Sequence, residues 1–111
     1  MEGVVRIMKW MLVVVLTAVA SAAQAAGSVE AGAAQAVTCA ACHGQDGATG
    51  IDPSYPSLAG QGAKYLNRQL QMFQSGKRDV PLMTAQLIGK SAQDLEDLAA
   101  YYASLPSKVG E

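Results

Sequence analysis

The sequence has few of the residues from which reactive or metal-binding sites are usually built. Its 111 residues include two cysteines, Cys39 and Cys42, and a single histidine, His43. Zinc sites usually take four ligands from cysteine and histidine, so these three residues cannot complete one. No stripe of lysine and arginine with interleaved aromatic residues is present, which excludes the usual surfaces for nucleic acid.

Large apolar side chains are also sparse. Half of the sequence is hydrophobic, but much of that fraction comes from alanine and from the N-terminal residues. A domain of fewer than about 90 residues with so few large side chains is marginal unless a disulfide, a metal or a cofactor lies at its centre. We therefore expect a group other than side chains to fill the middle of the fold.

The N-terminus has the three regions of an export signal in the expected order. Arg6 and Lys9 give the positive start, and an apolar stretch follows them. Ala23 and Ala25 place small residues at the two positions that a signal peptidase recognises. We expect cleavage after Ala25, so that residues 1–25 are the signal peptide and the protein is periplasmic.

A retained membrane anchor is the alternative interpretation of this stretch. Its purely apolar run, residues 10–20, is shorter than the roughly 20 residues that a spanning helix needs. Cleavage leaves residues 26–111, which suffice for one domain and not for two. This mature chain has six basic and eight acidic residues, a net charge near −2.

The mature sequence predicts an all-α fold with three main helices and two functional loops. The first helix is expected over residues 29–42, after the N-cap residue Ser28. Glycine, proline and aspartate are dense in residues 44–62, which predicts a long ordered loop. Residues 63–75 resume a helical pattern that Gly76 ends.

The C-terminal part of the sequence predicts a second loop and the last main helix. The loop is expected over residues 77–83, followed by one or two helical turns over residues 83–89. Ser91 and Asp94 have the pattern of a capping box, so the last helix should begin there. Its apolar face is broad, and Pro106 lies just beyond its end.

Cys39-Ala40-Ala41-Cys42-His43 is the Cys-x-x-Cys-His motif typical of covalent haem attachment. Positions i, i+3 and i+4 share one face of a helix. Both sulfurs can therefore bond to the vinyl groups along one side of a porphyrin while the imidazole binds the iron. The motif predicts one covalently bound haem c with its iron.

Other uses of the motif fit the sequence less well. A structural disulfide gives no reason for a histidine directly after the second cysteine. A thioredoxin-like redox pair needs a βαβ setting, which this sequence does not show. A zinc site lacks ligands, because the chain has no further cysteine or histidine.

With this motif the chain resembles the class I cytochromes c, in particular the small bacterial group of cytochromes c4, c5 and c553. The resemblance implies the small cytochrome c fold around one haem. It covers nearly all of the mature chain and rests on residues 39–44, Gly32, 56–60, 65–66, 69–70, 76–78, Met83, 94–95 and 98–101. It also implies that Gly32 and Tyr101 lie where the first and last helices cross. The chain departs from its relatives at Gln35 and Ala36, where they often have a large apolar residue.

The second axial ligand is sought among the methionines, since the chain has no second histidine. Signal removal leaves Met72, inside a predicted helix where packing is the simpler role, and Met83, on a loop after Pro81. The resemblance also implies the ligand methionine at that loop. Ligation by histidine and methionine raises the reduction potential and leaves no open position on the iron, which favours electron transfer over catalysis.

Two supporting residues are implied by the resemblance. The carbonyl oxygen of Pro56 would accept the Nδ1–H of His43 and fix its tautomer. Arg78 would approach a haem propionate. An ordinary turn proline and a solvated surface arginine are the alternatives.

The sequence as a whole predicts a carrier, not an enzyme, that passes single electrons between redox proteins in transient complexes. The alternative is a haem-bearing electron-transfer subunit of a dehydrogenase or an oxidase complex. In either case we expect contact with the membrane only through partner complexes. A gas-binding sensor or a peroxidase-like protein would require that Met83 is not a ligand.

Overall fold

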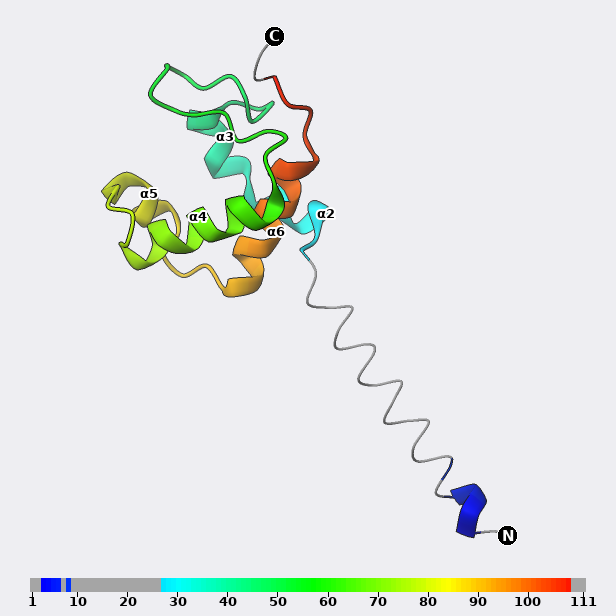
Figure 1. The fold of residues 1–111 in the computed structure, drawn as a ribbon. Coiled ribbons are helices and arrows are strands. Elements are labelled where there is room, and N and C mark those ends of the chain that lie inside the picture. The colour runs from blue at the N-terminus through cyan, green and yellow to red at the C-terminus, as the bar shows by residue number, and fades with distance from the viewer. Residues whose placement is uncertain (1–2, 7, 9–26, 109–111) are drawn as a thin grey trace.

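The computed structural model describes residues 3–6, 8 and 27–108. Residues 27–108 are helical with no strand, which confirms the all-α prediction (Figure 1). The helices are α2 (Val29–Gln35), α3 (Val37–His43), α4 (Ala63–Ser75), α5 (Pro81–Gln86) and α6 (Ala92–Ser104). Most of the predicted signal peptide, including its apolar run and the cleavage site, lies outside the described residues. Within those residues, no helix is both long and apolar enough to cross a membrane.

The first predicted helix is divided into α2 and α3. Ser28 caps α2 by accepting the N–H of Ala31 at 3.2 Å, as its position before the helix predicts. The division occurs at Ala36, which has a ψ of −5°. The chain bends at this residue, so α3 runs in a different direction from α2. The prediction of one continuous helix over residues 29–42 is therefore wrong. An alanine fits both a helix interior and a turn, so the sequence pattern did not reveal the break.

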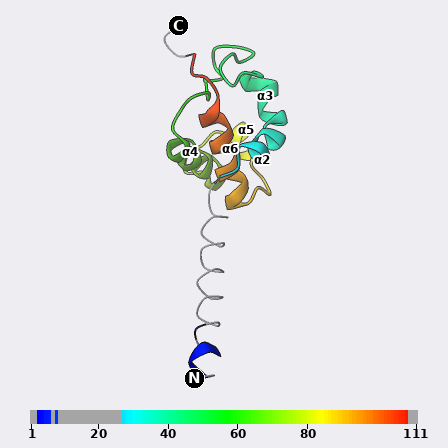
Figure 2. The ribbon, with the colours of Figure 1, turned by 90° about the vertical axis from the view of Figure 1, so that its right-hand side faces the viewer.

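Helix α6 lies at the centre of the described fold. In the turned view of Figure 2, α4 lies on one side of α6, and α2 and α3 lie on the other. A small cluster joins these helices and consists of Ala36, Leu66, Leu98, Ala99 and Tyr102. Two of its five members are alanines, which agrees with the sparse core expected from the sequence.

Polar side chains reinforce the crossing of α2 and α6. The backbone N–H of Ser28 donates to Asp97 Oδ1 at 2.7 Å. Gln35 Nε2 donates to Asp94 Oδ1 at 3.2 Å, and Gln35 Oε1 accepts from Lys90 Nζ at 3.1 Å. Gln35 thus bonds the end of α2 to the start of the last helix and to the residue before its N-cap.

Helix α5 begins earlier than the sequence predicts. The expected turns covered residues 83–89, whereas α5 runs from Pro81 to Gln86. Proline suits this first helical position because its φ is already helical and no N–H is needed there. Thr84 Oγ1 donates to the carbonyl oxygen of Phe73 at 2.7 Å and so attaches α5 to the end of α4. Met83 therefore lies on a helix and not on the predicted loop.

The ends of α4 and α6 agree with the sequence. Helix α4 has the predicted bounds, and Gly76 ends it with a φ of +79° that glycine adopts readily. Ser91 and Asp94 form the predicted capping box, with Ser91 Oγ accepting the Asp94 N–H at 3.1 Å and Asp94 Oδ2 accepting the Ser91 N–H at 2.8 Å.

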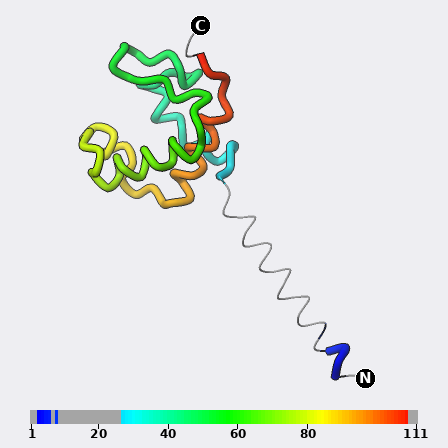
Figure 3. The backbone as a smooth tube through the Cα atoms, in the orientation of Figure 1, coloured from blue at the N-terminus to red at the C-terminus, as the bar shows by residue number. Residues whose placement is uncertain are grey.

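The long loop after α3 folds back onto the C-terminal end of α6. The carbonyl oxygen of Gly47 accepts the N–H groups of Leu58 at 2.7 Å and Ala59 at 3.0 Å, which closes the loop. The Gly60 N–H donates to the Tyr102 carbonyl at 2.9 Å. Figure 3 shows the loop beside the C-terminal segment. The loop that follows His43 is therefore held in place by the C-terminal end of α6.

Candidate haem attachment site

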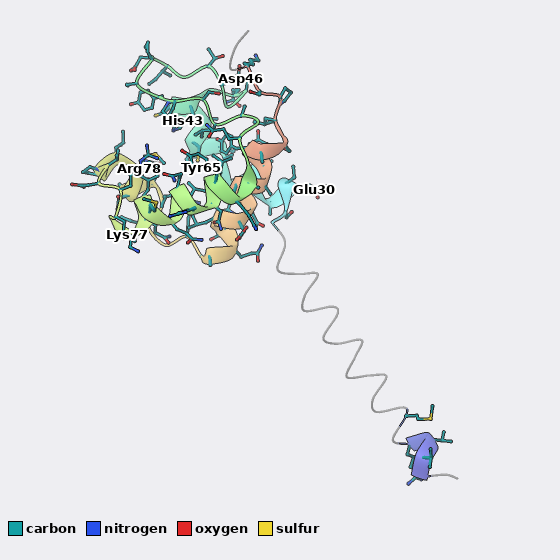
Figure 4. All side chains as sticks on the ribbon, in the orientation of Figure 1. Glu30, His43, Asp46, Tyr65, Lys77 and Arg78 are labelled. Atoms are coloured by element: carbon teal, nitrogen blue, oxygen red, sulfur yellow. The ribbon has the colours of Figure 1, made fainter. Side chains whose placement is uncertain are left out.

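Helix α3 carries Cys39, Cys42 and His43 in its last two turns. Both cysteines are half-buried free thiols, and His43 is only 7% exposed. The helix ends directly after the histidine because Gly44 adopts a φ of +90°. A Cβ on residue 44 would lie 2.1 Å from the Thr49 carbonyl oxygen, so this turn requires glycine. Figure 4 shows His43 at the end of α3 that meets the loop.

The loop orients the histidine through one hydrogen bond. The Nδ1 atom of His43 lies 2.9 Å from the carbonyl oxygen of Pro56. A carbonyl oxygen only accepts, so Nδ1 carries the proton. In the neutral imidazole Nε2 is then the nitrogen without a proton, and its lone pair can bind a metal. The structure thus brings Pro56 to the position at which it can fix the imidazole.

Tyr55 packs against the same imidazole. Its ring meets the His43 ring edge to face, with centroids 5.9 Å apart and an angle of 89° between the planes. The neighbouring Cys42 raises the pKa of Tyr55, with smaller contributions from burial and from Asp52. Tyr55 therefore lies beside the second cysteine as well as the histidine, and it was not among the site residues predicted from the sequence.

Tyr102 occupies the corresponding place beside the first cysteine. Cys39 packs against the buried cluster that contains Tyr102. Burial raises the pKa of Tyr102, and Cys39 raises it further. Each motif cysteine thus has a tyrosine as a neighbour, one from the loop and one from α6.

The two remaining predicted residues come from the part of the chain after α4, with Arg78 before α5 and Met83 within it. Met83 is half-buried in α5, and Met72, the alternative, is half-buried in α4. Arg78 is exposed, with its Nη1 donating to Gln69 Oε1 at 2.7 Å and its guanidinium 4.5 Å from the centre of the Phe73 ring. Arg78 therefore lies along α4 in this structure, and its approach to a propionate stays a prediction.

The residues present fit a covalently attached haem. Two free thiols share a helix with an imidazole whose Nδ1 is already bonded. The hydroxyl of Tyr102 is buried beside this site without a hydrogen-bond partner in the described chain. Large apolar side chains are also exposed on the loop and around α5; they are Ile51, Val80 and Leu82. Within residues 27–108, no three His, Cys, Asp or Glu side chains gather as ligands for a bare metal ion.

Known proteins match both the sequence and the fold. The pattern of the family described as cytochrome c matches residues 29–106. Cytochrome c4 of Pseudomonas aeruginosa is 50% identical over 88 residues, which cover 79% of this chain and 43% of the relative. Cytochrome c-554(548) of Halomonas halodenitrificans is 44% identical over 82 residues, which cover 71% of this chain and 98% of the relative. Reduced recombinant cytochrome c4 from Pseudomonas stutzeri, known from its crystal structure, matches with a TM-score of 0.68 at 44% identity, over 73% of this chain and 47% of that one.

The helical fold, the Cys-x-x-Cys-His motif on α3 and these matches together define a class I c-type cytochrome. The chain belongs to the cytochrome c family, whose members carry a covalently bound haem c and transfer electrons. It spans about half the length of the cytochrome c4 relatives that it matches. The resemblance inferred from the sequence is thereby confirmed.

Proposed function

We propose that this protein carries single electrons between redox proteins in the periplasm, through one haem bonded to Cys39 and Cys42 and ligated by His43 and Met83. The observation that carries the proposal is the 2.9 Å contact between His43 Nδ1 and the Pro56 carbonyl oxygen. It selects the tautomer whose Nε2 can bind iron, on the helix that also holds both thiols. When bound, the haem supplies a one-electron couple.

Attachments between α4 and α5 support Met83 as the second ligand. Thr84, the next residue, is bonded to the end of α4 through Phe73. Gln74 Nε2 donates to the carbonyl oxygens of Leu87 at 3.1 Å and Lys90 at 2.8 Å, which fixes the segment after α5. Met83 thus lies on a short helix that is fixed to α4 by the residues that follow the methionine.

Iron ligation by the thioether of Met83 would decide whether the protein is an electron carrier or an enzyme. It favours the reduced iron, and it leaves no position for a substrate. The protein would then be a carrier and not an enzyme. The exposed guanidinium of Arg78 donates one hydrogen bond to a side chain, that of Gln69. It would give up this bond and donate to a haem propionate instead.

The choice of Met83 can be tested by substituting each methionine in turn. The ferric wild-type protein should show the weak near-infrared charge-transfer band of His/Met ligation. Met83→Ala should remove that band, lower the reduction potential and allow carbon monoxide to bind the ferrous protein. Met72→Ala is the matched control and should retain the wild-type spectrum. Loss of the band in Met72→Ala, or ready binding of carbon monoxide by the wild type, would contradict the proposal.

The cellular location of the protein and its association with partners need a separate experiment. Osmotic shock of expressing cells should release the haem protein without residues 1–25, and size-exclusion chromatography should show it free of tightly bound partners. Stable co-elution with a dehydrogenase or an oxidase subunit would favour the alternative function as part of such a complex. Recovery with an intact N-terminus in the membrane fraction would favour the retained anchor.

A further inference from the structure

The hydroxyl group of Tyr102 is one of three buried polar side-chain atoms without a hydrogen-bond partner among the described residues; the others are Ser57 Oγ and Asn67 Oδ1. Tyr102 is 5% exposed, and its hydroxyl oxygen is buried. Folded proteins rarely leave a buried hydroxyl unpaired, because it has lost its water without gaining a partner. We therefore expect the hydroxyl to gain its hydrogen-bond partner only when the haem is attached.

The ring of Tyr102 cannot turn its hydroxyl towards water. On one side the ring packs on Gly47, where an added Cβ would lie 2.9 Å from Cδ1 of the ring. Its centroid lies 5.0 Å from that of the Tyr101 ring. The backbone is held as well, since the Tyr102 carbonyl oxygen accepts the Gly60 N–H at 2.9 Å. The direction of the hydroxyl is thus fixed by α6 and the loop together.

The neighbour that this fixed hydroxyl meets is Cys39. The cysteine packs against the buried cluster of which Tyr102 is a member, and its thiol influences the ionisation of Tyr102. A sulfur atom is only a weak acceptor, and the contact between the Cys39 thiol and the Tyr102 hydroxyl is looser than an ordinary hydrogen bond. Because burial raises the pKa of Tyr102, the hydroxyl stays protonated and can act as a donor.

We propose that Tyr102 is a positioning residue for the attached haem, whose hydroxyl donates to the Cys39 sulfur once that sulfur is a thioether. This inference rests on the proposed function. A donor directed at a group bonded to the porphyrin interacts more strongly with the electron-rich reduced state than with the oxidised state. Hydrogen bonding around the cofactor is one means by which a protein sets the potential of a haem. Tyr102 therefore raises the potential and holds the attached edge of the group against α6.

Removing only the hydroxyl tests this role in the haem-loaded protein. Tyr102→Phe should have a lower midpoint potential than the wild type by voltammetry, and a lower midpoint of unfolding in guanidinium. Tyr101→Phe is the matched control, because it removes a hydroxyl from the adjacent residue at the crossing of α2 and α6. The control should leave the potential unchanged.

Each other outcome contradicts the inference. A Tyr102→Phe protein that is as stable as the wild type, or more stable, would mean that the hydroxyl stays unpaired when haem is bound. Lower stability with an unchanged potential would mean that it bonds elsewhere. If Tyr102→Phe does not accumulate, resonance Raman spectra of the wild type decide, since the C–S stretching band should shift in D2O only when the sulfur accepts a hydrogen bond.

The same measurements separate this inference from the proposed function. A wild type with covalent haem and the near-infrared band, but with a potential equal to that of Tyr102→Phe, contradicts the role of Tyr102 alone. A wild type without covalent haem contradicts both.

Discussion

Gly32 on α2 lies directly against the backbone of Asp97 on α6. A Cβ on residue 32 would lie 2.0 Å from the Asp97 carbonyl oxygen and 2.7 Å from Tyr101 Cβ. No side chain can occupy that space without separating the two helices. The position that the family resemblance gave to Gly32 and Tyr101 is thus the one that the structure shows.

Gly32→Ala should therefore destabilise the haem-loaded protein. Adding a methyl group to a packed interior costs about 1–3 kcal/mol, and the upper end is expected because the obstacle is backbone. Equilibrium unfolding in guanidinium measures the change. Gly62→Ala is the control, since nothing lies within 4 Å of the added Cβ. Equal unfolding midpoints for the two variants would mean that the helices separate without cost.

Single substitutions of the motif cysteines should weaken covalent attachment, and the double substitution should abolish it. Each sulfur would supply one of two thioether bonds, so Cys39→Ala and Cys42→Ala each remove one. Haem staining after denaturing electrophoresis and pyridine haemochrome spectra measure attachment. Ala41→Ser changes an exposed position of the same motif and should attach haem normally. Haem retained by the double variant under denaturing conditions would contradict the attachment site.

Acid should loosen the loop at Asp46. The N–H of Ala48 holds the pKa of Asp46 well below its ordinary value, and Lys108 and Thr49 lower it further. The folded protein therefore binds this proton less tightly than the unfolded chain. The stabilisation is present above about pH 4, the ordinary range of aspartate, and is lost as the pH falls below it.

Asp46→Asn tests this effect through the pH dependence of unfolding. The variant should be less stable than the wild type at pH 7, and the difference should shrink as the pH falls below about 4. Asp79→Asn, at an exposed aspartate outside this network, serves as the control. A difference between Asp46→Asn and the wild type that does not change with pH would show that the charge of Asp46 is not involved.

The chain made without haem should be largely unfolded. The only large side chains that are fully buried in the described residues are Leu87, Leu95 and Leu98, which is a small core for the loops to fold against. Far-ultraviolet circular dichroism of cytoplasmically produced protein should show little helix. A cooperative thermal transition like that of the haem-loaded protein would show that the side chains suffice.

Sequence patterns correctly predicted the helix ends that are determined by neighbouring residues. The bounds of α4 follow from its apolar periodicity and from Gly76, and the start of α6 follows from Ser91 and Asp94. These features need only neighbouring residues to form, so a sequence pattern can reveal them. The motif on α3 belongs to the same class, because its chemistry follows from spacing along one helix.

Features that depend on packing were not predicted. The bend at Ala36 arises where α2 crosses α6 while α3 turns towards the loop, and alanine itself gives no sign of it. Tyr102 stood out only as part of an apolar helix face, so its hydroxyl beside Cys39 depends on contacts between distant segments. Tyr55 was one of several residues in a loop, and its approach to His43 depends on how that loop closes.

The ion pair between Asp46 and Lys108, 2.9 Å long and spanning 62 residues of sequence, has a consequence for the order of events during synthesis. The motif is complete once residue 43 has been made, whereas the residues that secure its surrounding loop come from the last turn of α6 and the segment after it. In a nascent chain both thiols are therefore exposed until these C-terminal residues have been made. The contacts that hold the loop beside His43 therefore cannot all form before residue 108 has been made.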